Sequence, residues 1–259
     1  MINAGVPGTG PGNHALNYAE FVAPFRPQLV IVGIFVNDVA DDLASPMFRA
    51  GPDGSLHPVP PDIRRQRAAE TERIRNVADR VPGYSFLAQH SHLVAHVRKA
   101  GTRALAGGDS GAVASDWPAF QRRFDREGLP LLRAAIESLS ASVRGSGAEL
   151  VIVMLPPREA IYADQGAYAE MMRWTTHRMR IELSRLAAER GAMLIDVTEP
   201  LRRGAASGER LYYHGFDIHP RPAGYAAIGR EIAARLEPVI ARMARQPGRQ
   251  GATGRGLGD

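Results

Sequence analysis

Three short apolar runs constrain the fold of this chain more than any other feature. They are "QLVIVGIFVND" at 28–38, "AELVIVMLPP" at 148–157 and "AMLIDVTEP" at 192–200, and each ends in a polar or proline-containing loop. Continuous runs of Val, Ile and Leu are typical of strands that are buried on both faces of a parallel sheet. Between the last two runs, an approximate helical stripe of apolar residues ends at Gly191. The sequence therefore predicts an α/β fold that contains a strand, helix, strand unit.

The remaining segments favour helices around this sheet. Charged helical segments are predicted at 62–80, 85–106 and 117–144. We expect most of them to form a helical insertion at about 45–145, within one domain that spans residues 1–241. A final helix is predicted to begin near Pro222, because proline suits the first turn of a helix and an apolar face follows it. The Gly-rich, arginine-containing stretch 242–259 is predicted to be disordered.

Composition narrows the classes of protein. Much of the formal charge of +5 comes from arginines in the stretch 242–259, so a solvated tail is favoured over a polyanion contact and no nucleic-acid partner is predicted. The chain has no cysteine, which excludes disulfides and thiolate metal sites. His92 and His96 have the spacing of zinc ligands, but no third ligand is evident and exposed helix positions explain them better. Neither a metal nor an organic cofactor is predicted.

No apolar run approaches the roughly 20 residues that a membrane-spanning helix requires. The opening "MINAGVPGTG" lacks the basic start and apolar stretch of a signal peptide. Because a chain without cysteine suits a reducing or an oxidising compartment, the localisation stays open.

The segment "DIHPRPAGY" at 217–225 contains the first candidate catalytic residues. A carboxylate that accepts a hydrogen bond from Nδ1 of a histidine fixes its tautomer and leaves Nε2 to act as a base. Asp217 and His219 could meet this need within one loop. The alternative is a surface turn that Asp217 caps.

Three further loops follow or precede the predicted strands. Asn37 and Asp38 come directly after the first strand, where the Asn37 amide could donate to an oxyanion; the alternative is a helix cap. The segment "NAGVPGTGPGN" at 3–13 could cradle an anion with backbone N–H groups, although a plain turn explains it as well. In open parallel sheets, ligands bind in a crevice at the carboxyl ends of the strands. Arg158, in "PPREAIY", could contact an anion from the wall of this crevice, unless the segment is only a rigid turn. Asp38 and Arg158 are the predicted substrate contacts.

Taken together and in this order, these segments resemble the blocks of the SGNH (GDSL-type) hydrolase family. "INAGVPGTG" resembles the second block, "GIFVND" the third and "DIHPRPAGY" the fifth. The resemblance implies that Gly8 and Asn37 form the oxyanion hole and that Asp217 and His219 belong to the catalytic triad. It also implies a three-layer, flavodoxin-like parallel sheet with helices on both faces, and a serine-dependent esterase or carbohydrate deacetylase. Its substrate would be a small-molecule or carbohydrate ester.

The family's first block, a Gly-Asp-Ser that carries the nucleophile after the first strand, has no match before the second block. The chain does contain "GDS" at 108–110, but no strand-like run precedes it, so an interhelical loop is a better interpretation of Ser110 than a nucleophile. We therefore expect the first strand and the serine to lie upstream of Met1. Two alternatives stay open: a non-catalytic truncated relative that binds a carbohydrate or acyl ligand, and a polysaccharide O-acyltransferase that uses the same site.

Overall fold

The three predicted strands form one parallel sheet. The computed structural model describes residues 1–6, 9–44, 47–60, 117–213 and 219–245. Its sheet has the order β1-β4-β5, with β1 at Leu29–Phe35, β4 at Glu149–Leu155 and β5 at Met193–Asp196. Each strand is shorter than the predicted run, because the polar and proline residues at its end turn away from the sheet.

β4 is the central strand and pairs along its length with β1. The register runs from Leu29 opposite Glu149 to Phe35 opposite Leu155, while β5 pairs with Val151–Met154 in the middle of β4. Ile34 and Ile152 are fully buried, as expected for the middle of a sheet that is covered by helices. The mixed α/β class and the parallel sheet are thus confirmed.

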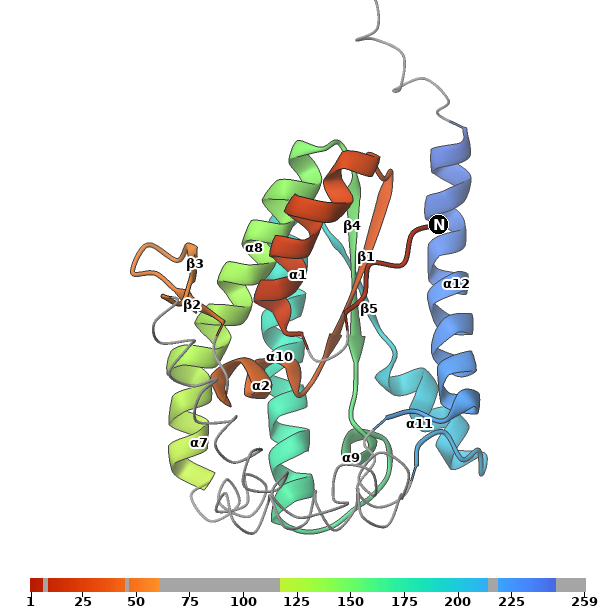
Figure 1. Cartoon of the computed structure of the whole chain (residues 1–259). Coiled ribbons are helices and arrows are strands. Elements are labelled where there is room, and N and C mark those ends of the chain that lie inside the picture. Colours follow the sequence, from red (N-terminus) through yellow and green to blue (C-terminus); the bar gives the residue numbers. More distant parts are fainter. Residues whose placement is uncertain (7–8, 45–46, 61–116, 214–218, 246–259) are drawn as a thin grey trace, which may run out of the picture.

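Helices α8 and α10 pack on one face of the sheet, together with the shorter α1 (Figure 1). The elements on this side, in chain order, are α1 (Pro11–Asn17), the π-turn η1 (Tyr18–Val22), the 3₁₀ turn η2 (Ala23–Phe25), α2 (Asp38–Ala44), α7 (Trp117–Arg123), the π-turn η3 (Phe124–Gly128), α8 (Leu129–Gly145) and α10 (Ala167–Arg190). α10 ends at Gly191, whose positive φ of 62° provides the left-handed helix cap that the sequence predicts. α8 lies in the range predicted as an insertion, yet its buried residues join the main core on the sheet.

The opposite face of the sheet is covered by α11 (Thr198–Ala206) and α12 (Pro222–Ala244) (Figure 1). The short helix α9 (Arg158–Ile161) follows β4, and an antiparallel hairpin of β2 (Phe48–Ala50) and β3 (Leu56–Pro58) lies beyond α8. α12 begins at Pro222 as predicted. It continues through Ala244, and Arg242 pairs with Glu149, so the helix extends a few residues into the stretch 242–259.

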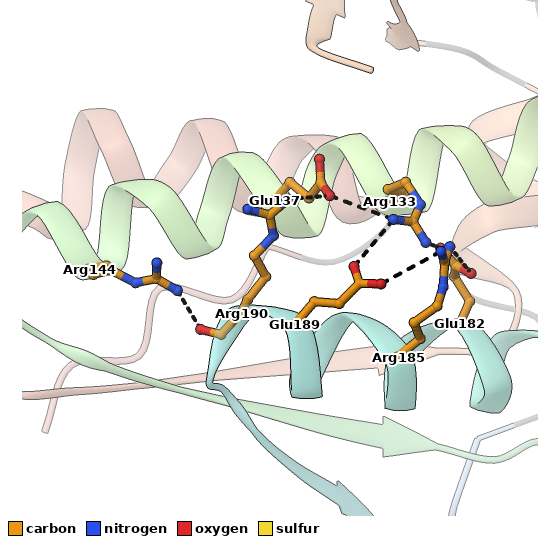
Figure 2. Close-up of polar contacts among 7 residues, drawn as sticks. All are labelled: Arg133, Glu137, Arg144, Glu182, Arg185, Glu189 and Arg190. Carbon is orange, nitrogen blue, oxygen red and sulfur yellow. Dashed lines mark hydrogen bonds and ion pairs between the residues drawn. The ribbon is translucent and has the colours of Figure 1, made fainter. Parts of the chain in front are cut away.

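A network of ion pairs joins α8 to α10 (Figure 2). Arg133 lies 2.6 Å from Glu182 and 3.4 Å from Glu189. Glu182 is only 11% exposed in its side chain, and this burial raises its pKa although the Arg133 guanidinium opposes the shift. The network therefore satisfies a carboxylate that would otherwise be poorly solvated between the two helices.

Several predictions fall outside the described residues. They are the helices at 62–80 and 85–106, the pair His92 and His96, Ser110, Gly8 and Asp217. No helix in the described ranges is long and apolar enough to cross a membrane.

Candidate active site

The carboxyl ends of β1 and β4 bring two of the predicted loops to one edge of the sheet. Asn37 and Asp38 follow β1, and Pro156 follows β4, which is the neighbouring parallel strand. Asn37 is half-buried at this edge. One carboxylate oxygen of Asp38 accepts a hydrogen bond from the Phe35 backbone N–H at 2.8 Å. Asp38 therefore fixes the turn after β1, in addition to any contact with substrate.

The described part of the Gly-rich segment packs against the helix that follows β1. A Cβ atom on Gly10 would lie 2.2 Å from Oδ1 of Asp42 in α2, and a Cβ on Gly12 would lie 2.5 Å from the Phe48 ring. No larger residue fits at either position without a shift of its neighbours. These close approaches explain two of the glycines and bring the segment to the same edge of the sheet as Asn37.

His219 lies on a short antiparallel bridge that is fixed to the end of β4. Tyr212 pairs with Pro220, and the Tyr213 N–H donates to the His219 carbonyl at 3.4 Å. The Tyr212 hydroxyl donates to the Pro156 carbonyl at 2.7 Å. His219 is exposed. The bridge therefore holds an accessible imidazole at the same edge of the sheet where the loops after β1 and β4 begin.

Gly224 explains why a glycine follows the histidine in this motif. A Cβ at this position would lie 2.2 Å from the Leu211 carbonyl oxygen and 2.9 Å from Cβ of Pro220. α12 can thus approach the bridge closely only because residue 224 has no side chain. The sequence contains this signal in "PRPAGY", but it does not reveal which backbone the glycine contacts.

Arg158 is held by its own loop. Its guanidinium makes two contacts with the Asp164 carboxylate, one of them at 3.2 Å from Nη2, and its Cζ lies 5.5 Å from the centroid of the Tyr162 ring. The Arg158 side chain is mostly buried. An anion would therefore compete with Asp164 for this cation.

Glu159 is a residue that the sequence did not single out. It is 7% exposed, and its Oε2 atom is buried without a hydrogen-bond partner. Burial raises the pKa of this carboxyl, although Arg158 and Arg173 act in the opposite direction. In "PPRE", a glutamate is expected on an exposed turn. The only sequence signal for a functional role of Glu159 was its position shortly after a buried strand.

A serine, a histidine and an aspartate also lie close together in the hairpin of β2 and β3. Ser55 Oγ is 2.7 Å from Nε2 of His57 and 2.5 Å from Oδ1 of Asp53. In a catalytic triad the carboxylate lies on Nδ1, on the far side of the imidazole from the serine. Here the carboxylate contacts the serine itself and lies 3.9 Å from Nε2. The hydrogen bonds from Ser55 lower the pKa of Asp53, and the arrangement closes an exposed turn.

A groove of about 1130 Å³ runs beside the outer edge of β1. It is bounded by the amino-terminal residues, by α1 and η1, and by the end of α12. None of its lining residues is an Asp, Glu, Lys or Arg; they are Met1–Gly5, His14, Asn17, Tyr18, Val22, Pro27–Gly33, Leu139, Ile240, Met243 and Ala244. Ile31 and Ile240 are 48% and 54% exposed there. The groove is therefore a largely apolar surface next to a sheet edge.

No group of three or more His, Asp or Glu side chains that could hold a metal ion occurs in the part of the chain that the structure describes. The residues that stand at the edge of the sheet are suited to proton transfer and to hydrogen bonding.

Comparison with known proteins identifies the family. The model of the family described as "SGNH hydrolase-like domain, acetyltransferase AlgX" matches residues 118–257, which is more than half of the 259 residues. The match includes most of α7, all of α8 to α12, and His219, but not Asn37. Searches of curated proteins and of solved structures find no match to the chain. The predicted SGNH membership is confirmed: the chain belongs to the family of AlgX-type SGNH hydrolase-like domains.

Proposed function

We propose that this domain transfers an acyl group, with acetyl as the simplest case, to a hydroxyl group of a polysaccharide. The observation that carries the proposal is the match to a family named for an acetyltransferase, over a range that includes His219. Hydrolysis of esters, the function that the sequence favoured, requires the same residues and differs only in the acceptor, which is water instead of a sugar hydroxyl. The family name favours the sugar.

The proposed chemistry proceeds in two steps. A serine attacks the carbonyl of the acyl donor, His219 takes the serine proton, and Asp217 orients the imidazole. The donor's leaving group departs with that proton. A sugar hydroxyl then attacks the acyl-serine, His219 takes the hydroxyl proton, and the proton passes to the serine as the ester of the sugar leaves. Gly8 N–H and the Asn37 amide stabilise the oxyanion that forms in both steps.

The serine is proposed to lie on a strand that pairs with the outer edge of β1. Two observations support this position. In the described residues β1 pairs only with β4, and the largely apolar groove lies along its other edge. A parallel strand at that edge would end beside Asn37, because the carboxyl ends of parallel strands meet at one edge of a sheet. With this strand the sheet would become the central layer of the flavodoxin-like arrangement that the family resemblance implies.

The test uses the protein at the length at which its native host produces it. A fluorophosphonate probe is expected to label one serine, and p-nitrophenyl acetate is expected to acetylate that serine. His219→Ala should reduce acetylation by roughly 10³-fold or more, and Asn37→Ala by about 10²–10³-fold. His177→Ala is the matched control, because His177 is also an exposed histidine but lies on α10.

Three results would revise the proposal. If no serine is labelled and His219→Ala has no effect, the domain is a non-catalytic binding protein. If the serine is acetylated but only free acetate is released in the presence of oligosaccharides, the domain is an esterase. If acetylation depends on His219 and not on Asn37, the oxyanion-hole assignment of Asn37 is wrong.

A further inference from the structure

The bridge that carries His219 also brings an aromatic ring beside it. In an antiparallel pair, side chains on one face of one strand lie opposite those on the same face of the other. Because Tyr212 pairs with Pro220, Tyr213 is the residue directly opposite His219. The two faces of the bridge differ in burial: Tyr212 is 1% exposed, whereas Tyr213 is 41% exposed and His219 is also exposed. Tyr213 and His219 therefore share the outer face of the bridge.

Arg221 holds the Tyr213 ring in place. It lies two residues beyond His219, so its side chain is on the same face of the extended segment. Its Cζ atom is 5.6 Å from the centroid of the Tyr213 ring, a distance typical of a cation–π contact. The Arg221 backbone N–H donates to the Leu211 carbonyl at 2.8 Å, which fixes the backbone on both sides of the pair. The guanidinium covers one face of the ring.

Packing does not require Tyr213 to be aromatic. The neighbouring Tyr212 is buried and uses its hydroxyl to bind Pro156, so it accounts for the attachment of the bridge to β4. Among the described residues, no hydrogen bond to the Tyr213 side chain occurs, and a large part of the ring is left in solvent beside His219, the proposed base. Exposed aromatic rings at such positions are suited to stack against the C–H groups on the apolar face of a sugar ring, and they lose little conformational entropy when they do so.

We infer that Tyr213, positioned by Arg221, is the residue that binds the sugar acceptor. A pyranose ring that lies against Tyr213 would place one of its hydroxyl groups close to His219, where its proton can be removed. This inference rests on the proposed function, because it assigns the acceptor of that reaction. It also predicts that the Tyr213 ring is where the protein selects a sugar over water as the acceptor.

The kinetic test separates the two steps of the reaction. The protein at its native length is acetylated with p-nitrophenyl acetate, and cellohexaose, xylohexaose and chitohexaose are supplied as acceptors. Tyr213→Ala should raise the KM for the acceptor by about five- to tenfold, the value of one aromatic contact, while the rate of p-nitrophenol release stays unchanged. Tyr213→Phe should behave like the wild type. Arg221→Gln should give a smaller increase in KM, because the ring remains but is no longer fixed.

The matched control is Phe21→Ala. Phe21 is an exposed aromatic residue on η1, which precedes the amino end of β1 and so lies away from His219. It should leave both steps unchanged. Equal losses in both steps with Tyr213→Ala would overturn the inference, because Tyr213 would then act by positioning His219. An unchanged KM for the acceptor would overturn it as well, and so would an acetylated enzyme that transfers its acetyl group to none of the hexaoses.

A binding measurement distinguishes failure of this inference from failure of the proposed function. Calorimetric titration of the same hexaoses requires no nucleophile. If the sugars bind to the wild type and not to Tyr213→Ala, while no acyl-enzyme forms in either, the sugar site stands and the transferase proposal falls. If an acyl-enzyme forms but no sugar binds to the wild type or to Tyr213→Ala, the sugar site at Tyr213 falls and the transferase proposal stands.

Discussion

At the scale of single residues, Glu159 is held where its charged form is poorly stabilised. Burial is the largest effect on this carboxyl and raises its pKa. A backbone hydrogen bond, Arg158 and Arg173 favour its ionisation, and Asp164 opposes it. Folded Glu159 therefore binds its proton more tightly than the unfolded chain does. Stability should fall as the pH rises from the usual glutamate pKa through the raised value, and the loss is complete above that value.

Glu159→Gln should remove this dependence on pH. Above the raised pKa, the variant should be more stable than the wild type, and the gain should vanish in acid, where wild-type Glu159 is protonated in both states. Urea denaturation from pH 4 to pH 8 measures the difference in the free energy of unfolding. Glu237→Gln, at an exposed position of α12, is the control for the removal of one carboxylate. A gain that is largest in acid would contradict the assignment.

At the scale of secondary-structure elements, the position of α12 depends on one glycine. A methyl group on Gly224 would collide with the Leu211 carbonyl, whereas nothing lies within 4 Å of a Cβ on Gly229 in the same helix. Gly224→Ala should therefore destabilise the protein by about 1–3 kcal/mol through overpacking, and Gly229→Ala should stabilise it by about 0.5–1 kcal/mol. Thermal denaturation followed by circular dichroism measures both. Equal effects of the two substitutions would show that α12 does not approach the bridge closely.

The elements also show which features a sequence can predict. β1, β4, β5 and α10 follow from long apolar patterns, and the turn after β1 follows from where its pattern stops. The hairpin of β2 and β3 does not, because strands of three residues contain too few alternating positions to be recognised. The bridge that carries His219 is a single residue pair, fixed by the Tyr212 hydroxyl on a distant loop. Motifs therefore predicted that His219 is important, but only tertiary contacts reveal that Tyr213 lies beside it.

At the scale of the whole molecule, the outer edge of β1 is an apolar edge of the sheet that the described residues leave unpaired. An exposed edge of this kind pairs readily with another chain. In the chain of 259 residues, Ile31 should therefore promote self-association and the binding of apolar dyes, and Ile31→Lys should reduce both. Ile181→Lys provides a close control, because Ile181 on α10 is 49% exposed and Ile31 is 48% exposed.

The same substitution should have the opposite consequence when a strand occupies the groove. In a longer protein that supplies this strand, Ile31 would be buried, so Ile31→Lys should reduce the free energy of unfolding by several kcal/mol, as expected for an unpaired buried charge. Ile181→Lys should remain near neutral in both proteins. Light scattering measures association of the short chain, and urea denaturation measures stability of the long one. If Ile31→Lys is harmless in the long protein, the groove stays open there, and the strand that carries the serine must pair elsewhere.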